Sequence, residues 1–320
     1  MTAYPAADPV GLLPPVALLF PGQGVQRPGM GLDLTRRFPE ADRAISHAEQ
    51  VLEMPVRRLC FEGPAEQLLL TENIQPCLVA VSYAAFEAYR TRFDTGSIAA
   101  VAGHSLGEIS ACAASGTITW EDALLLVRER GRLMADAATS NPGRMLAVVG
   151  LSQERIEEIR QEASRAGGIW LANLNSSNQF ILSGEAAAIE VAENLSNRAG
   201  ARRVVLLDIP LGAHSPLMSR AAAKLAETVR ALPLRAPQIP LIANGSGFVL
   251  HSVVAVRSEL IGHLLRPVLW ARTMAAMQRL HVATVVELGP GRVLASLAAK
   301  HMAGVVTWNA DELLIEEMGS

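Results

Sequence analysis

Short, uninterrupted apolar runs alternate with amphipathic stretches along most of this chain. Runs such as VALLF (Val16–Phe20) and IAAVA (Ile98–Ala102) stop at glycine-containing turns, as buried strands of a parallel sheet do. Between such runs, segments such as Gln75–Phe93 and Trp120–Ala138 carry apolar residues at helical spacing. This alternation predicts an α/β fold built on a mainly parallel sheet.

The pattern changes at Asn141-Pro142-Gly143. From there the order is strand, charged helix, two strands around a polar turn, helix and strand, which is typical of a ferredoxin-like unit. We therefore predict an α/β-hydrolase-like large subdomain into which a ferredoxin-like small subdomain is inserted. The expected parts are a loose arm (1–15), the large catalytic subdomain (16–141 and 211–307), the small subdomain (142–210) and a tail (308–320).

Composition then excludes several functional classes. The 320 residues are 50% hydrophobic and 18% charged, which predicts a globular protein with a substantial core. A net charge of −3 with scattered basic residues gives no nucleic-acid footprint, and three cysteines are too few for a disulfide framework or a zinc site. No uncharged apolar run is long enough to span a bilayer, and the N-terminus lacks the basic segment of a signal peptide. We therefore expect a cytoplasmic protein with no metal, no nucleic-acid partner and no membrane partner.

The most informative motif is GHSLG, at residues 103–107. It follows an apolar run and precedes an alanine-rich helical stretch, so it sits where a strand turns into a helix. A serine between two glycines at such a turn is typical of a nucleophile elbow, because the turn crowds any larger side chain. We interpret Ser105 as a nucleophile. The alternative is a serine that only caps a helix.

A nucleophilic serine needs a base, because an unassisted hydroxyl reacts poorly at neutral pH. His214 is the best candidate, since it lies in LGAHSPLM between a predicted strand and helix and follows two small residues. His104 adjoins Ser105, and adjacent side chains diverge too much for an ordinary base. No aspartate between Ser105 and His214 lies in a persuasive loop. A Ser–His dyad therefore fits better than the triad of a standard hydrolase.

The PGQG turn, at residues 21–24, also ends a buried run. Ligands collect at this edge of open α/β sheets. The backbone N–H of Gln23, together with that of Leu106 after the nucleophile, would complete an oxyanion hole. The alternative is a plain glycine-rich turn.

Three arginines alternate in the helical segment LLLVRERGRLM: Arg128, Arg130 and Arg132. At this spacing they cannot all face one way. An arginine that faces inward must meet an anion, because an unpaired buried guanidinium is very costly. A substrate carboxylate held bidentately would serve. Position alone leaves open which of the three faces inward.

Together, these stretches resemble the malonyl-CoA:acyl carrier protein transacylase family, which includes the acyltransferase domains and stand-alone acyltransferases of polyketide synthases. The resemblance extends from about residue 16 to residue 300, with the motifs in family order and spacing. The segments that carry it are FPGQGVQRPGMG, AGHSLGEISACAASG, VRERGRLM, GRMLAVVG, NLNSSNQFILSG, GAHSPLM, RPVLW and ELGPGRVL.

The resemblance implies a set of catalytic roles. Ser105 would accept the acyl group from a coenzyme A thioester, with His214 acting as base and then as acid. The phosphopantetheine thiol of an acyl carrier protein would be the acceptor, and no permanently bound cofactor is implied. Gln23 and Leu106 would supply the oxyanion-hole amides. Arg130 would be the arginine that binds the substrate carboxylate.

The resemblance also implies the residues around the acyl group. His104 and Met134 would line the acyl pocket. A backbone carbonyl, usually contributed by a glutamine, would orient the catalytic histidine, and that position here is His263. The residue before the catalytic histidine is often phenylalanine or serine in the family, whereas here it is the smaller Ala213. Less bulk at this position leaves room for a substituted malonyl group or a larger acyl chain.

The primary hypothesis is a ping-pong acyltransferase of fatty acid or polyketide synthesis that moves a malonyl-type group from coenzyme A to an acyl carrier protein. One alternative is transfer of a larger acyl group between carrier proteins. A second is an editing acyl-thioester hydrolase on the same scaffold, in which Arg130 has no obvious purpose. A third is a carrier-binding subunit without catalysis, and the intact Ser105, His214 and PGQG set argues against it.

Overall fold

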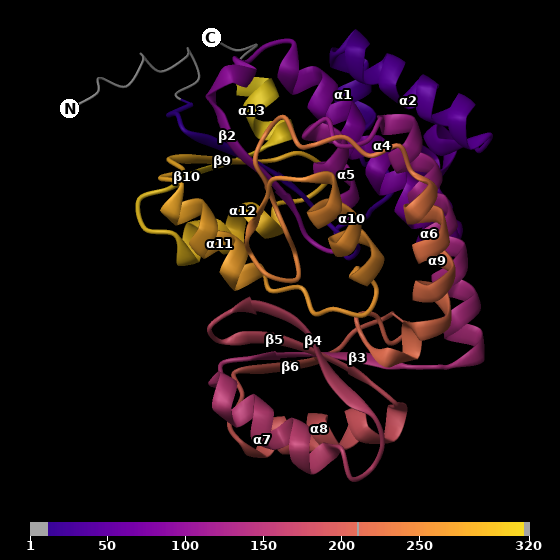
Figure 1. The fold of residues 1–320 in the computed structure, drawn as a ribbon, viewed down its shortest axis with the longest axis vertical. Coiled ribbons are helices and arrows are strands. Elements are labelled where there is room, and N and C mark those ends of the chain that lie inside the picture. The colour runs from indigo at the N-terminus through magenta and orange to yellow at the C-terminus, as the bar shows by residue number, and fades with distance from the viewer. Residues whose placement is uncertain (1–11, 210, 317–320) are drawn as a thin grey trace.

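The computed structural model describes residues 12–209 and 211–316, which form a large subdomain and a small one (Figure 1). The strands are β1 (Val16–Phe20), β2 (Ile98–Gly103), β3 (Arg144–Val149), β4 (Ile169–Ser176), β5 (Gln179–Gly184), β6 (Arg203–Leu206), β7 (Leu241–Ile242), β8 (Val249–Leu250), β9 (Thr284–Glu287) and β10 (Val306–Asn309). They form a six-stranded sheet of order β10-β9-β1-β2-β7-β8 and a four-stranded sheet of order β4-β5-β3-β6.

Helices cover both sheets. The α-helices are α1 (Leu32–Arg37), α2 (Pro39–Leu52), α3 (Ala65–Leu69), α4 (Thr71–Arg90), α5 (Gly107–Ala114), α6 (Trp120–Ser140), α7 (Gln153–Ala163), α8 (Ala186–Arg198), α9 (Ser219–Ala231), α10 (Val253–Gly262), α11 (Trp270–Arg279), α12 (Val293–His301) and α13 (Ala310–Glu316). Shorter turns are η1 (Arg58–Glu62), η2 (Thr95–Ser97) and η3 (Pro216–Met218). Within the described ranges, no helix is both long and apolar enough to cross a membrane.

The predicted fold class is confirmed. In the large sheet, β10, β9, β1, β2 and β7 run parallel, and only β8 pairs antiparallel, with β7. The small sheet is antiparallel throughout, and its element order is β3-α7-β4-β5-α8-β6. Its strand order is that of a ferredoxin-like unit, and all its strands lie within residues 142–210.

Strand β1 shows why the central strands read as continuous apolar runs. Successive side chains of a strand point to opposite faces of the sheet. Leu18 and Phe20 pack in the core on the side of α4, α5 and α6, whereas Ala17 and Leu19 pack in a second core with α11 and α12. Because helices cover both faces, every residue of β1 is buried.

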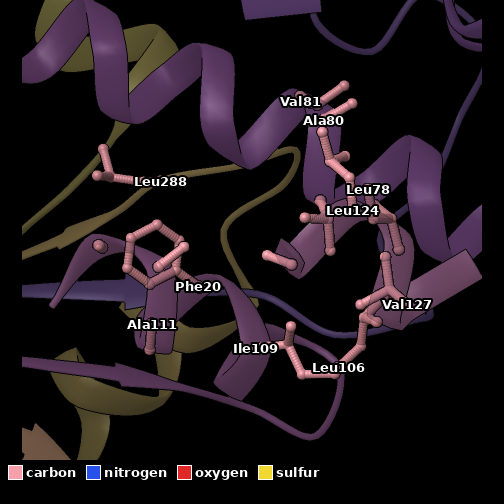
Figure 2. Close-up of a cluster of buried hydrophobic side chains, with 14 of the residues drawn as sticks. Phe20, Leu78, Ala80, Val81, Leu106, Ile109, Ala111, Leu124, Val127 and Leu288 are labelled. Carbon is pink, nitrogen blue, oxygen red and sulfur yellow. The ribbon is translucent and has the colours of Figure 1, made fainter. Parts of the chain in front are cut away.

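The first of these cores anchors the turn after β2. Figure 2 shows Leu106 and Ile109, at the start of α5, in one buried cluster with Phe20 of β1 and with Leu124 and Val127 of α6. Leu106 is only 1% exposed. Burying a leucine side chain of this kind stabilises the fold by about 1.5–3 kcal/mol, so the residue after Ser105 is held firmly against the core.

The small sheet presents one face to its own helices and the other to the large subdomain. Leu146 of β3 and Leu182 of β5 pack in a core with α7 and α8, which cover the outer face in Figure 1. Their neighbours Met145 and Ile181 face the other way and line a pocket between the subdomains. Strand β4 is also joined to the large subdomain, because Leu174 N–H donates to the Val268 carbonyl at 2.8 Å.

Two predicted terminal segments need correction. Residues 12–15 are not a loose arm, because the Leu13 backbone exchanges hydrogen bonds with the Thr284 hydroxyl, at 3.0 and 2.8 Å. Residues 308–316 are not a tail, because β10 extends the large sheet beside β9 and α13 follows it. The other residues of these predicted segments, 1–11 and 317–320, lie outside the described residues.

Candidate active site

The predicted elbow is present at the carboxyl end of β2. Ser105 has a φ of 49°, in the left-handed region that a serine rarely adopts. A Cβ on Gly103 would lie 1.9 Å from the Gly107 carbonyl oxygen, and a Cβ on Gly107 would lie 2.0 Å from the Phe20 carbonyl oxygen. Neither position can accept a side chain, so both glycines of the motif are required by backbone packing.

The structure brings Ser105 and His214 together across 109 positions of sequence. Ser105 Oγ lies 2.8 Å from His214 Nε2. His214 Nδ1 lies 2.9 Å from the carbonyl oxygen of Arg266, so that nitrogen carries the proton and Nε2 is free to accept one. This corrects the prediction for His263: the orienting hydrogen bond is made by Arg266, and the His263 carbonyl has only a lesser effect on the pKa of His214.

The surroundings keep His214 neutral. Burial, and then the charge of Arg130 and the neighbouring His104, lower the pKa of His214 to about 3. The side chain is 4% exposed and has no carboxylate partner among the described residues. The His214 ring is thus unprotonated at neutral pH, and its Nε2 can accept a hydrogen bond from the Ser105 hydroxyl.

Arg130 is the inward-facing arginine of the three. It is 1% exposed, whereas Arg132 pairs with Glu129 on the surface. Arg130 Nη1 donates to Gln75 Oε1 at 2.7 Å, and Nη2 lies 3.3 Å from Ser105 Oγ. Burial lowers the pKa of Arg130 to about 9, so the guanidinium remains charged at neutral pH.

Gln75 is a site residue that sequence reasoning missed. It is fully buried on α4, and its Nε2 lies 3.4 Å from both Gln23 Oε1 and Met134 Sδ. The available signal was a glutamine inside an otherwise apolar helix face. Met134 contacts this glutamine and is not among the residues that line the pocket.

His104 lies beside Ser105 and is held by the small subdomain. Its Nε2 is 2.9 Å from Asn175 Oδ1 and 3.4 Å from Asn173 Nδ2, and both asparagines belong to β4. The ring also packs against Trp270, with the ring centroids 5.6 Å apart. Although His104 partly faces the pocket, protein atoms surround the ring, and this desolvation lowers the pKa of His104.

A pocket of about 240 Å³ opens above Ser105 and His214, between the two subdomains. His104 and Ala213, two of the predicted substrate-binding residues, line it. Most of the remaining wall is apolar and comes from both subdomains. The apolar lining residues are Val25, Met145, Ile181, Leu207, Ile209, Leu211, Val293, Leu294 and Leu297.

The PGQG turn lies against the elbow. A Cβ on Gly22 would be 2.5 Å from the His104 carbonyl oxygen, so the two turns touch backbone to backbone. Gln23 lines the pocket. Within the described part of the chain, neither the Gln23 N–H nor the Leu106 N–H has a hydrogen-bond partner. Both donors are therefore unused near Ser105.

A second residue that the sequence analysis missed is Asn244, which holds the backbone of Ser105. Its Oδ1 accepts a hydrogen bond from the Ser105 N–H at 2.8 Å, and its Nδ2 donates to the Gly103 carbonyl. Its own N–H donates to Glu108 Oε1 at 2.8 Å. No local pattern marks Asn244, because it follows β7 more than 130 positions after the elbow.

No group of three or more His, Cys, Asp or Glu side chains in residues 12–209 and 211–316 is arranged to hold a metal ion. Cys60, Cys77 and Cys112 are free thiols, and all three are buried in the core of the large subdomain.

The fold and the site together define an α/β protein with an inserted antiparallel subdomain, in which a serine at a strand-to-helix turn is hydrogen-bonded to a histidine from a remote segment. Comparison with known protein families then identifies the family. The chain belongs to the acyltransferase domain family, whose model, "Acyl transferase domain", matches residues 17–304. This confirms the resemblance that the motifs indicated.

Individual relatives are similar over nearly their whole length. The malonyl CoA-acyl carrier protein transacylase of Bacillus subtilis (strain 168) is 37% identical over 286 residues, which cover 89% of this chain and 90% of that protein. The crystal structure of an acyl-carrier-protein S-malonyltransferase from Bartonella henselae matches with a TM-score of 0.90 and 34% identity, covering 95% and 98% of the two chains. A malonyl-transacylase in complex with its type II PKS acyl-carrier protein matches with a TM-score of 0.90 and 33% identity, covering 95% and 99%.

Proposed function

We propose that this protein transfers a malonyl group from coenzyme A to the phosphopantetheine thiol of an acyl carrier protein, through an acyl-enzyme on Ser105. Its relatives carry malonyl-transacylase names, and one of them is seen with an acyl carrier protein. The Ser105–His214 hydrogen bond supports the covalent route, because it joins a serine nucleophile to a neutral base.

The first half-reaction loads Ser105. Its Oγ attacks the thioester carbonyl carbon while His214 Nε2 takes the hydroxyl proton. The unused N–H groups of Gln23 and Leu106 are the proposed donors to the oxyanion that develops on the carbonyl oxygen. When the carbon–sulfur bond breaks, His214 returns the proton to the coenzyme A sulfur.

The second half-reaction is the reverse with a different thiol. His214 takes the proton of the phosphopantetheine thiol, and the sulfur attacks the Ser105 ester. The carbon–oxygen bond breaks, and Ser105 recovers its proton from His214. Throughout, the Arg266 carbonyl holds His214 Nδ1–H and stabilises the imidazolium that forms transiently.

One observation carries the choice of a malonyl group. Arg130 is a charged, buried guanidinium beside Ser105 Oγ, and within the described residues it forms no ion pair with a carboxylate. Glu108 is near enough to raise the pKa of Arg130, but the hydrogen-bond partners of Arg130 are the neutral groups of Gln75 and Ser105. A substrate carboxylate would supply the missing anion and would hold the thioester at Ser105.

The lining of the pocket supports a donor whose malonyl group carries a substituent. Ala213 leaves little bulk next to His214, and the remaining wall is largely apolar. A 2-substituted malonyl group would place its carboxylate at Arg130 and its alkyl branch against this wall.

The decisive experiment is intact-mass analysis of Ser105 labelling by malonyl-CoA, followed by addition of a holo acyl carrier protein. We expect a malonyl adduct on the wild type, none on Ser105→Ala, and transfer of the adduct to the carrier protein. Competition with methylmalonyl-CoA and acetyl-CoA would rank the donors. Rapid release of free acid without a carrier protein would instead favour the hydrolase, and absence of any adduct would contradict the acyl-enzyme.

A further inference from the structure

The carbonyl oxygen of Ser105 accepts two hydrogen bonds. One is donated by the Glu108 N–H at 2.9 Å, in the first turn of α5. The other comes from the side chain of His263, whose Nε2 lies 3.0 Å from the same oxygen. Because Asn244 already holds the Ser105 N–H, both backbone polar groups of the nucleophile are fixed by side chains from remote segments.

His263 belongs to the segment that orients the base. The Arg266 carbonyl, which accepts from His214 Nδ1, lies three residues after His263. The Arg266 N–H and the Leu265 N–H both donate to the Gly262 carbonyl at 3.0 Å, so residues 262–266 form one compact turn. Within this turn, the side chain of His263 therefore contacts the Ser105 backbone, while the carbonyl of Arg266 contacts His214.

The hydrogen-bond pattern defines the form of His263. An acceptor oxygen at Nε2 requires a proton on Nε2, and Nδ1 is buried without a partner. The groups facing the ring are Glu108 from α5, Arg130 from α6, and His214 at a ring-centroid distance of 6.3 Å. Burial and the charge of Arg130 lower the pKa of His263, which is consistent with a neutral ring.

We propose that His263 is a positioning residue, which donates its Nε2–H to the Ser105 carbonyl and so couples the turn carrying the Arg266 carbonyl to the nucleophile elbow. This assignment rests on the proposed Ser105 nucleophile. His263 touches neither reacting atom directly. Its effect is to keep Ser105 Oγ and His214 Nε2 at their 2.8 Å separation in spite of the left-handed backbone at Ser105.

The elbow needs such a restraint because its conformation is unfavourable in isolation. A non-glycine residue held at positive φ costs about 1–3 kcal/mol and persists only where the surroundings over-determine it. Without the His263 donor, the Ser105 carbonyl keeps only the helical bond from Glu108, and the turn 262–266 contacts the elbow only indirectly, through the Arg266 carbonyl and His214. A small displacement between nucleophile and base is then expected to lower the reactivity of Ser105.

The test measures Ser105 reactivity with a small fluorophosphonate, which reports on the nucleophile without requiring malonyl recognition. We expect His263→Leu, which lacks the donor, to react about ten- to a hundredfold more slowly per folded molecule. His263→Gln can still donate from its amide and should stay within about threefold of wild type. The exposed His251→Leu is the matched control and should react at the wild-type rate.

The outcomes separate this proposal from the proposed function. A wild-type rate for folded His263→Leu, or an equal loss in His263→Gln, would overturn the positioning role. Failure of malonyl labelling with unchanged fluorophosphonate behaviour would count against the malonyl function alone. If His263→Leu does not fold, the ¹⁵N signals of His263 in the wild type decide the matter: a neutral ring protonated on Nε2 supports the proposal, and one protonated on Nδ1 contradicts it.

Discussion

Arg130 Nη1 donates a 2.7 Å hydrogen bond to Gln75 Oε1, and this contact joins α6 to α4 directly beside Ser105. Both side chains are buried, so neither can exchange the other for water. The amide oxygen satisfies one guanidinium hydrogen without neutralising the charge. Gln75 therefore holds Arg130 in place and leaves its charge available for a carboxylate.

Removing this support is expected to weaken malonyl loading. Gln75→Ala leaves a buried guanidinium hydrogen unpaired and lets Arg130 move, which should cost about 1–3 kcal/mol, or roughly five- to 150-fold in kcat/KM for malonyl-CoA. The exposed Gln67→Ala on α3 is the control and should behave as wild type. Steady-state transfer to a holo carrier protein measures the effect. Equal kinetics for the two variants would show that Gln75 does not position Arg130.

Replacing Arg130 itself should affect labelling by malonyl-CoA and by acetyl-CoA differently. Arg130→Ala removes the only charge proposed to bind the substrate carboxylate, so malonyl labelling of Ser105 should fall by two orders of magnitude or more. Acetyl labelling should be spared or enhanced, because acetyl-CoA has no such carboxylate. Intact mass after incubation with each thioester gives both rates. An equal loss of both would remove the carboxylate-binding role.

The depressed pKa of His214 predicts an acid-dependent loss of stability. The folded protein holds His214 at a pKa of about 3, while the unfolded chain has an ordinary value near 6.5. Between these values the unfolded state binds the extra proton, so the free energy of unfolding falls as the pH drops below about 6.5.

Urea unfolding at pH 7 and pH 5 can isolate this contribution. From pH 7 to pH 5, the free energy of unfolding should fall less for His214→Asn than for the wild type. The difference between the two proteins should be up to about 1.4 kcal/mol per pH unit. His104 and His263 also have lowered pKa values and remain in the variant, so part of the slope should persist. The exposed His251→Asn should keep the full wild-type slope. A wild-type slope in His214→Asn would mean that His214 is not held neutral by burial.

The raised pKa of Glu287 predicts the opposite pH dependence of the free energy of unfolding. It lies at the end of β9, is fully buried, and accepts a hydrogen bond from the Ala295 N–H of α12 at 2.9 Å. Burial raises the pKa of Glu287 to about 7. Between pH 4.5 and 7 the folded state therefore holds a proton that the unfolded state has lost, and stability falls as the pH rises.

Glu287→Gln removes that titration while keeping an amide oxygen for the helix. Its stability relative to wild type should increase from pH 5 to pH 8, by about 1.4 kcal/mol for each unit of the pKa shift as an upper bound. Thermal unfolding at the two pH values measures this change. Glu154→Gln, at the exposed start of α7, should show no such increase. A pH-independent difference for Glu287→Gln would contradict the raised pKa.

The sequence predicted features that are encoded locally. The strand, turn and helix around Ser105 follow from one apolar run and two glycines, and the structure shows that backbone packing excludes a side chain at both. The ferredoxin-like insertion was readable for the same reason, because its element order and polar turn are contiguous in the chain. The choice of His214 as the base used a local signal as well, a histidine between a strand and a helix.

Contacts between remote segments were not readable in this way. Asn244 reaches Ser105 from beyond β7, and β10 joins the large sheet only because β9 is already in place beside β1. The orienting carbonyl of His214 belongs to Arg266 rather than His263, since the turn of residues 262–266 decides which oxygen points at the ring. Every residue carries the same backbone oxygen, so sequence alone cannot distinguish them.

By itself, then, the sequence determined the fold class and the family and proposed Ser105 and His214 as the reacting pair, because each of these depends on neighbouring residues or on motifs in fixed order. Only the tertiary structure decided that the Arg130 guanidinium lies beside Ser105 Oγ, that Gln75 supports it, and that the side chain of His263 holds the Ser105 backbone. The physical reason is packing: whether a side chain is desolvated, and which atom it then meets, depends on segments that can lie more than 150 positions away.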